Sequence, residues 1–473
     1  MVNFSVLSEA DKTLVHDESL KILEQVGIRL ESPKTLAMLK EKGCDVDEAS
    51  SVVKFPSALV EKALASCPRK FILGAPDPKN DLFLGEGNTY IATDGQSCFA
   101  FDTEKGERRD SVMTDLMDAA KIVSKLDYIQ LFWPIVSAGD LPEEIRTVSE
   151  FARGINVVGK HFQTDCFSEA QAAYYIKVLE AMCGSREKAI ERKLLSLVCC
   201  PVSPLVYDAE MTEGCLALTE LEVPILILPM PISGTTGPMS LLGTVIANNT
   251  EVLAGVTIFQ LKKPGTPILY GSAPGILDMA TTLFCTGSPE GALQNAASCE
   301  MAKRYGLPVL ISTNCSEAKE PDVQAGREKA ATLTACAMTR PDILCGVGLV
   351  DAANLYYPEM LVLDEDSVGY ALRIVGGIRG GAEHALTDAV LAVGPGGDFL
   401  SQKSTRAYLR NGEHYRPAMT VRQSFETWAA SPDGDIRAKA RKKVAEILAG
   451  PDINHLSDDV RAKLDKILSD VEK

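Results

Sequence analysis

Residues 194–201 read LLSLVCCP and residues 223–231 read VPILILPMP. Both runs are short and free of charged side chains, as expected of β-strands that are buried on both faces of a sheet. Runs of this kind recur every 29 to 43 residues through the middle of the chain, and a stretch with helical patterning follows each of them. They span residues 129–136, 160–166, 194–201, 223–231, 266–272, 307–314 and 342–350.

Seven consecutive strand–helix units predict a parallel sheet, because a crossover through a helix joins parallel neighbours. A closed α/β barrel of the (β/α)8 TIM type fits these units better than an open doubly wound sheet. The eighth strand comes either from the segment near residue 90 or from beyond residue 370, and the pattern leaves both open. Nucleotide binding is not indicated, since GVGLVD at residues 346–351 lacks the third glycine of the dinucleotide fingerprint.

Helix boundaries are marked clearly in two of these units. Ser168 precedes a predicted helix that ends at Gly184, and Gln171 completes a capping-box pattern with it. Ser288-Pro289-Glu290 opens another helix that ends at Gly306. Both signals support helices between the predicted strands.

The segments before and after the strand–helix units are predicted to be extensions of the barrel. Residues 1–120 are expected to form helices and a β-hairpin packed on the barrel, with Ser32 and Pro33 starting one helix that ends before Gly43. The hairpin is predicted from residues 89–93 and 98–101 around the turn 94–97, with a second turn at 104–106. Residues 121–395 are assigned to the barrel and residues 396–473 to a helical cover or assembly surface.

Charge and hydropathy exclude several classes of protein. The net charge is −16 and no dense Lys/Arg block occurs, so nucleic-acid binding is not expected. Residues 223–250 lack charge, but their prolines and glycines argue against a membrane-spanning helix. The N-terminus has no basic region followed by an apolar core, so no secretory signal is predicted and a cytoplasmic location is expected.

Metal ligands are not concentrated in the sequence. The 13 cysteines include no Cys-x-x-Cys pair, and they fit best as reduced thiols in the core. The 5 histidines include no pair at helical ligand spacing, which makes a structural zinc site improbable. No bound metal is therefore expected, although a catalytic site built from distant residues stays open.

In a barrel of this type the active site lies at the carboxyl ends of the strands. The predicted strand ends supply Trp133, Pro134, Thr164, Asp165, Ser203, the loop 233–237, Gly271, Ser272, Asn314, Cys315, Gly348 and Asp351.

Four segments resemble the trimethylamine methyltransferase superfamily. They read PISGTTGP at residues 231–238, NTEVLAG at 249–255, TNCSEAKEPDVQAG at 313–326 and GPGGDF at 394–399. The similarity extends over roughly residues 5 to 430, and its motifs occur in the family's order. It implies a TIM barrel that transfers an N-methyl group to cob(I)alamin on a separate corrinoid-binding protein.

Cys315 stands where the trimethylamine enzymes of this superfamily have pyrrolysine. Pyrrolysine is thought to hold a tertiary amine as an adduct, and members without it resemble methyltransferases of quaternary amines such as glycine betaine or proline betaine. A quaternary nitrogen already has the positive charge that makes its methyl group transferable. The resemblance therefore implies a non-pyrrolysine, quaternary amine:corrinoid protein methyltransferase, in which proximity and orientation supply most of the acceleration.

The site that this chemistry needs has three kinds of candidate residue. Aromatic faces for the quaternary cation are Phe99, Phe132, Trp133, Tyr356, Tyr357 and Phe399, and each is equally or more readily a core residue. Acids for charge compensation are Asp94, Glu317 and Asp351. Hydroxyls for the substrate carboxylate are Thr235, Thr236 and Ser272. Cys315 is interpreted as a pocket wall, because no histidine lies nearby in the sequence to activate its thiol.

Two other functions are considered. A barrel lyase or Schiff-base aldolase would use Lys319, but the neighbouring Glu317 and Glu320 would raise the pKa of its amine rather than lower it. A non-catalytic betaine-binding subunit is the second alternative. A homo-oligomer is expected in each case.

Overall fold

The computed structural model describes residues 4–103, 105–431 and 434–471. Its centre is a closed barrel of eight parallel strands, each hydrogen-bonded to the next along the chain and the last to the first. The strands are β6 (Tyr90–Thr93), β9 (Leu131–Phe132), β10 (His161–Asp165), β11 (Leu195–Cys199), β13 (Ile225–Ile227), β15 (Ile268–Ser272), β18 (Val309–Ser312) and β19 (Ile343–Val347). The TIM-barrel prediction is confirmed, and each of the seven apolar runs contributes one strand.

The eighth strand is β6, and this corrects the predicted hairpin. Residues 90–93 pair with β19 and β9 inside the barrel, and all of them except the half-buried Tyr90 are buried. β7 (Phe99–Asp102) instead pairs antiparallel with β8 (Glu107–Asp110). The turn between β7 and β8 includes Glu104, which lies outside the described residues. The barrel thus begins near residue 90, inside the segment predicted as the N-terminal extension.

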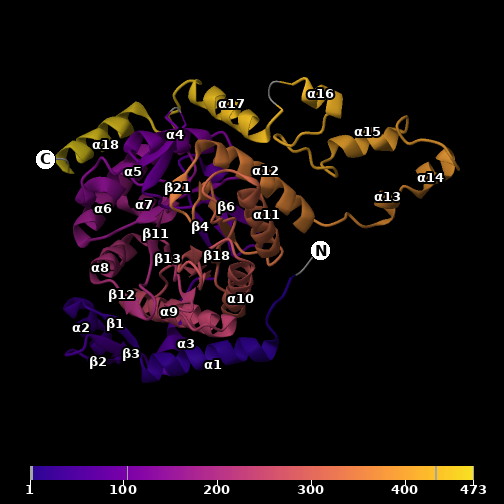
Figure 1. Cartoon of the computed structure of the whole chain (residues 1–473). Coiled ribbons are helices and arrows are strands. Elements are labelled where there is room, and N and C mark those ends of the chain that lie inside the picture. The colour runs from indigo at the N-terminus through magenta and orange to yellow at the C-terminus, as the bar shows by residue number, and fades with distance from the viewer. Residues whose placement is uncertain (1–3, 104, 432–433, 472–473) are drawn as a thin grey trace.

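Eight helices surround the barrel, one after each strand (Figure 1). They are α4 (Met113–Val123), α5 (Glu143–Val158), α6 (Glu169–Cys183), α8 (Ala209–Leu218), α9 (Leu241–Lys262), α10 (Pro289–Tyr305), α11 (Val323–Ala337) and α12 (Pro358–Val375). The Ser168 and Ser288 hydroxyls accept the backbone N–H groups of Gln171 and Gly291, and Gly184 and Gly306 end these helices in the left-handed conformation. Both predicted helices are confirmed.

Short elements connect these strands and helices. They are α7 (Arg186–Arg192), β12 (Val206–Tyr207), η2 (Thr219–Leu221), β14 (Ile232–Ser233), β16 (Gly275–Leu277), β17 (Phe284–Cys285), β20 (Leu349–Val350) and β21 (Leu355–Tyr356).

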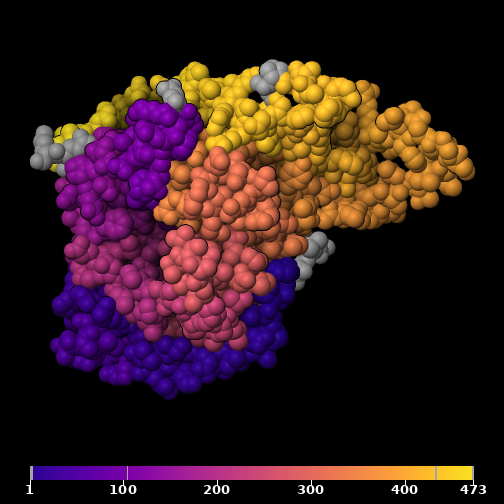
Figure 2. Space-filling model, in the orientation of Figure 1, coloured from indigo at the N-terminus to yellow at the C-terminus, as the bar shows by residue number. Residues whose placement is uncertain are grey.

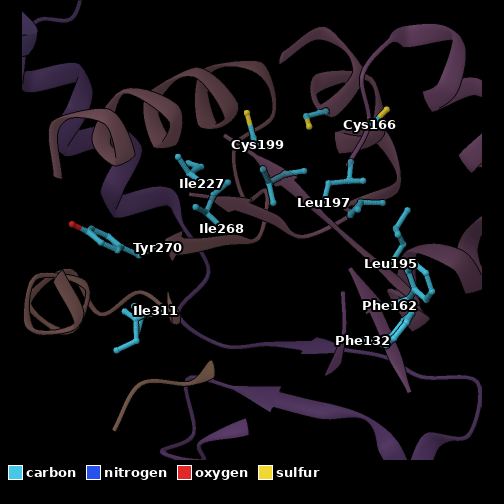
Figure 3. Close-up of a cluster of buried hydrophobic side chains, with 14 of the residues drawn as sticks. Phe132, Phe162, Cys166, Leu195, Leu197, Cys199, Ile227, Ile268, Tyr270 and Ile311 are labelled. Carbon is cyan, nitrogen blue, oxygen red and sulfur yellow. The ribbon is translucent and has the colours of Figure 1, made fainter. Parts of the chain in front are cut away.

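Side chains alternate between two cores along each barrel strand. Leu195, Leu197 and Cys199 of β11 point outward to the helices, together with Phe162 and Ile227 (Figure 3). The residues between them point inward and fill the barrel with Val198, Leu226, Leu269, Leu310 and Ile343. All 13 cysteines are free thiols, as the sequence predicts.

An N-terminal layer covers the barrel from below and from one side. β4 (Phe71–Leu73) and β5 (Leu82–Leu84) form an antiparallel pair linked by η1 (Pro78–Asn80), and their leucines join the inner core. The His161 ring hydrogen-bonds the carbonyl of Gly74 at 2.8 Å, so this pair closes the amino-terminal end of the barrel. The remaining elements are α1 (Glu9–Gln25), β1 (Ile28–Leu30), α2 (Pro33–Glu41), β2 (Asp45–Asp47), β3 (Val52–Lys54) and α3 (Ser57–Ser66).

α9 is the one described helix that is long and apolar enough to cross a membrane, and 72% of its most apolar window is buried. α1 and α3 pack on one side of it and the barrel on the other. Its apolar composition is explained by this position between two layers.

The C-terminal part divides into packed and projecting helices. α17 (Ile436–Leu448) packs on α12 and α4, and α18 (Asp458–Val471) packs on α6 and α5. The segment that follows α12 and precedes α17 in the sequence projects away from the body (Figure 2). The projecting helices are α13 (Ala382–Ala385), α14 (Thr387–Val393), α15 (Lys403–Arg410) and α16 (Phe425–Ala429).

Candidate active site at the carboxyl ends of the strands

Asp94, Cys315 and Cys345 meet inside the barrel at its carboxyl-terminal end. Asp94 directly follows β6, and its backbone N–H donates to the carbonyl of Val347 at 3.0 Å. The Sγ atom of Cys315 lies 4.0 Å from Asp94 Oδ2, and that of Cys345 lies 3.9 Å from Asp94 Oδ1. Two predicted site residues, Asp94 and Cys315, are thus brought together.

Burial sets the ionisation of this cluster. It raises the pKa of Asp94 to about 6, while the charge of Lys329 acts in the opposite direction. It raises the pKa of the Cys315 thiol to about 12, and the neighbouring Asp94 carboxylate adds to the rise. A thiol that stays protonated is a poor nucleophile, so the cluster favours a non-covalent role for Cys315.

Trp133 and Asp165 line the same end of the barrel. The Thr93 hydroxyl fixes the Trp133 backbone by accepting from its N–H at 2.8 Å and donating to its carbonyl at 2.6 Å. Gly95 lies against the indole ring, where a Cβ atom would come within 2.6 Å of it. Gly95 is therefore required for this packing, and Trp133 as a whole residue is 7% exposed.

Asp165, the last residue of β10, points inward beside Trp133. Burial raises the pKa of its carboxyl to about 7, and the nearby indole of Trp133 partly offsets the rise. The sequence places Asp165 at a strand end but not among the candidate site residues. The sequence feature that could have identified Asp165 is an acidic residue at the end of a buried strand.

Two buried donors at this end of the barrel have no protein partner. Among the described residues, the side-chain nitrogens Gln96 Nε2 and Gln163 Nε2 form no hydrogen bond. Gln163 lies in β10, and Gln96 lies in the loop that follows β6. Since buried polar groups are normally paired, these donors indicate that the lumen receives a polar ligand or ordered water.

A buried ion pair supports the backbone next to Cys315. The ammonium of Lys329, on α11, lies 3.0 Å from Asp364 Oδ2 on α12 and donates to the carbonyl of Asn314 at 2.7 Å. Asp364 also accepts the backbone N–H of Gly348 at 2.7 Å. The pair joins the loops after β18 and β19 and so positions Cys315. Removing one partner would leave an uncompensated buried charge at a cost of about 3–5 kcal/mol.

The other two predicted acids are engaged outside the lumen. Glu317 accepts the backbone N–H of Gly287 at 2.6 Å and the hydroxyl of Thr286 at 3.3 Å. Asp351 forms an ion pair with Lys319, whose side chain is largely exposed. Lys319 thus lies at the surface and not inside the barrel, which removes the basis for a Schiff-base mechanism.

Trp133 is the one predicted aromatic side chain that joins the cluster. Phe132 points outward and packs edge-on against Phe162, with ring centroids 5.4 Å apart. Phe99 lies beneath the guanidinium of Arg108, and Tyr356 is buried in β21. Tyr357 stacks on Phe101 and Phe399 lies on the projecting segment, both away from this cluster.

Two of the three hydroxyls predicted to bind the substrate carboxylate already contact the protein backbone. The Thr236 hydroxyl accepts the backbone N–H of Ile232 at 2.8 Å, and the Thr235 hydroxyl contacts the carbonyl of Ile232 at 3.5 Å. Side chains alternate along β15, and Ile268 and Tyr270 point outward. Ser272 therefore also points outward, so its unpartnered hydroxyl faces the helices. Exposed Met239 and Met279 lie beside Gly234 of the Thr235 loop, and Met230, which is also exposed, precedes this loop in the sequence.

Comparison with known proteins identifies the family. The family model described as trimethylamine methyltransferase matches residues 1–470. The chain belongs to this family.

A trimethylamine methyltransferase of Methanosarcina thermophila is 30% identical over 97% of this chain and 96% of its own length. A glycine betaine methyltransferase of Desulfitobacterium hafniense is 28% identical over 98% of this chain and 97% of its own length. The crystal structure of the Methanosarcina barkeri monomethylamine methyltransferase superposes with a TM-score of 0.55 at 12% identity, over 94% of this chain and 89% of that one. This likeness supports the barrel fold.

Membership in the methyltransferase family makes position 315 testable. Replacement of Cys315 by Ala is expected to retain methyl-transfer activity within about threefold, because the protonated thiol of Cys315 is a poor nucleophile. Initial rates of the wild-type and variant enzymes measure the effect, and circular dichroism confirms the fold. A folded alanine variant without activity would assign a chemical role to the thiol.

Proposed function

We propose that this protein transfers an N-methyl group from a betaine, most simply glycine betaine or proline betaine, to cob(I)alamin on a partner corrinoid-binding protein. One observation carries the proposal: Asp165 lies beside the indole of Trp133, and a second buried carboxyl group, Asp94, directly precedes the Gly95 that packs against the same indole. Anions and an aromatic face together are the groups that attract a quaternary ammonium ion, which has no N–H to donate.

The chain's own residues bind and orient the substrate. In the proposed site, Trp133 contacts the N-methyl groups, while Asp94 and Asp165 compensate the charge on nitrogen. The Lys329–Asp364 pair acts as a positioning element by holding the loops around Cys315. When bound at the mouth, the corrinoid supplies the reduced cobalt nucleophile that accepts the methyl group. Fixed orientation inside a closed pocket then lowers the barrier by reducing the entropy that the encounter would cost.

The carboxyl-terminal mouth suits a large partner. The β4–β5 pair fills the opposite end of the barrel, so a corrin ring would approach over the rim. Met230, Met239 and Met279 are exposed there. Flexible thioether side chains adapt to a partner surface, which supports this rim as the side from which the corrinoid protein approaches.

The substrate class follows from position 315. A protonated cysteine cannot provide the adduct attributed to pyrrolysine, whereas a quaternary amine needs no adduct. The relative of Desulfitobacterium hafniense described as a glycine betaine methyltransferase supports the same class. We also propose that the enzyme acts in the cytoplasm, where thiols stay reduced.

Anaerobic incubation with glycine betaine and chemically reduced free cobalamin tests the proposal directly. The expected result is the absorbance change of a methylated corrinoid together with equimolar dimethylglycine. Glycine, which has the carboxylate but no N-methyl group, is the matched control. Binding of glycine betaine without dimethylglycine formation, even after the cognate corrinoid protein is added, would instead indicate a betaine-binding subunit.

Ligand stabilisation is expected to depend on pH. The folded-state pKa values of Asp94 and Asp165, about 6 and about 7, lie above the unfolded value. Their contribution to stability is therefore complete at about pH 4 and is lost as the pH rises through 6 and 7. A bound quaternary cation compensates the ionised carboxylates and offsets this loss.

Millimolar glycine betaine should consequently raise the melting temperature more at about pH 8 than at about pH 5.5. Differential scanning fluorimetry with glycine at the same concentration corrects for non-specific solute effects. An equal or smaller shift at the higher pH would contradict the charge compensation by these two carboxylates.

A further inference from the structure

A projecting segment of the chain has no core of its own. Residues 377–412, here called the arm, extend from the barrel as α13, α14 and α15 (Figures 1 and 2). The structure describes every residue of the arm, and none of its three helices has a buried side chain. Helices of 4, 7 and 8 residues are marginal in water without tertiary packing. The arm therefore needs a surface that covers it.

The arm is apolar where it projects. Ile378 is 92% exposed, Leu391 75% and Leu400 88%, and Val390, Phe399 and Leu409 are also exposed. A groove of about 520 Å³ runs between α14 and α15 and is lined by Leu386, Val390, Phe399, Tyr408 and Leu409. A contiguous apolar surface of this kind marks an interaction site.

The base of the arm is fixed to α12. Arg373 donates from Nη1 to the carbonyl of Gly377 at 2.6 Å and from Nε to the carbonyl of Glu413 at 2.9 Å. Thus both ends of the arm are held at one point of the body. Tyr370 and Ile374, one helical turn apart on α12, are exposed beside this point and extend the apolar surface of Ile378 onto the barrel.

Charge distinguishes the arm from the rest of the chain. The arm has four basic residues, Arg379, Lys403, Arg406 and Arg410, and three acidic ones, Glu383, Asp388 and Asp398, so its net charge is +1. The whole chain has −16, which leaves −17 on the remaining residues. The net charge of a second copy's body is thus opposite in sign to that of the arm, and three of the four basic residues of the arm lie on α15.

We propose that the arm docks on a second copy of this chain. In a two-fold arrangement each arm covers the α12 surface around Tyr370 and Ile374 of its partner, so the same apolar patch is used twice. Such an exchange buries the side chains that the single chain exposes and brings a basic helix to a chain of net negative charge. The GPGGDF motif at residues 394–399 lies on the arm, so this arrangement assigns the motif a role in assembly.

The mass of the full-length protein in solution tests this inference. Sedimentation velocity at several micromolar concentrations should give a dimer or a larger assembly. The double variant Leu391→Asp/Leu400→Asp should lower the mass at least twofold. Leu14→Asp/Val26→Asp, which changes two exposed residues on and directly after α1, is the matched control and should leave the mass unchanged.

A charge-reversed arm provides a second variant that leaves the apolar residues in place. Lys403→Glu/Arg406→Glu/Arg410→Glu should weaken association at least tenfold at low ionic strength, and less so at high salt. A wild-type protein that stays monomeric, including one that uses the arm only to bind a corrinoid protein, would overturn the inference. So would an assembly whose mass neither arm variant changes. Methyl transfer to free cobalamin, measured in parallel, reports on the proposed function independently.

Discussion

Replacement of Asp165 by Asn is expected to reduce methyl transfer from glycine betaine by about 30-fold to 5,000-fold, the equivalent of about 2–5 kcal/mol for a desolvated charge pair. The substitution keeps the size of the side chain and removes the negative charge beside Trp133. A cation that enters the lumen then faces one carboxylate, Asp94, instead of two. Because the charge acts on bound substrate, kcat/KM for glycine betaine is the quantity to measure.

The same variant should be more stable than the wild-type enzyme. A carboxyl group whose folded-state pKa is raised to about 7 destabilises the protein at higher pH, since ionisation is easier in the unfolded chain. The neutral amide removes this cost, so the melting temperature at about pH 8 should rise while activity falls. A purely structural role of Asp165 would produce the opposite change in stability.

Asp17→Asn is the matched control, because Asp17 lies on the exposed face of α1. It should change neither activity nor melting temperature. If Asp165→Asn retained wild-type kcat/KM, the two-carboxylate site would be wrong, although the enzyme could still be a methyltransferase.

The barrel could be predicted from the sequence because its strands are buried on both faces. Residues 194–201 and 223–231 must be free of charge and almost entirely apolar, and this requirement leaves a signal that does not depend on partners far along the chain. β6 was harder to assign. Its four residues are followed closely by β7, a spacing typical of a hairpin, and the choice of β19 as its neighbour depends on closure of the whole barrel.

The side-chain directions at the strand ends could not be predicted. Phe132 and Trp133 are adjacent in sequence, yet one packs against Phe162 among the helices and the other lines the lumen. A shift of one residue in the strand register exchanges the two faces, and short strands contain too few residues to fix it. Ser272 was assigned to the site for the same reason and faces the helices.

The residues that support the site left no local signal either. Lys329 reaches the carbonyl of Asn314 from α11, 15 residues later in the chain, and its partner Asp364 lies on α12. A single lysine in a helix usually indicates a solvent-exposed position. Its burial follows from the packing of α11 and α12 against the barrel, which sequence patterns do not specify.

Tertiary amines are expected to be poor substrates, with rates at least about 100-fold below those of the betaines, a barrier difference of about 2.7 kcal/mol or more. A neutral amine would have to expel an amide anion, and the protonated thiol of Cys315 offers no adduct that could activate it. Transfer to reduced cobalamin should be compared for glycine betaine, proline betaine, carnitine, choline, dimethylglycine and trimethylamine at equal concentration.

Among the quaternary amines, those with a carboxylate should exceed choline by about tenfold or more, the value of one hydrogen bond to a charged group. The donors proposed for this carboxylate are at the Thr235–Thr236 loop, so Thr235→Val/Thr236→Val should narrow the difference between glycine betaine and choline. Met279→Leu, a change on the same rim, is the control and should preserve it.

The choline and trimethylamine results test two separate claims, that the substrate carboxylate is bound at the rim and that a quaternary nitrogen is required. If choline reacted faster than every betaine, the anchor at the rim would be wrong, but the pair Asp94 and Asp165 would still explain binding of the cation. If trimethylamine reacted at a rate comparable to glycine betaine, a quaternary nitrogen would not be needed, and the interpretation of Cys315 as the residue that sets the substrate class would fail. Because the two carboxylates attract any cation, including protonated trimethylamine, binding alone cannot distinguish these cases, and the comparison must be made on turnover.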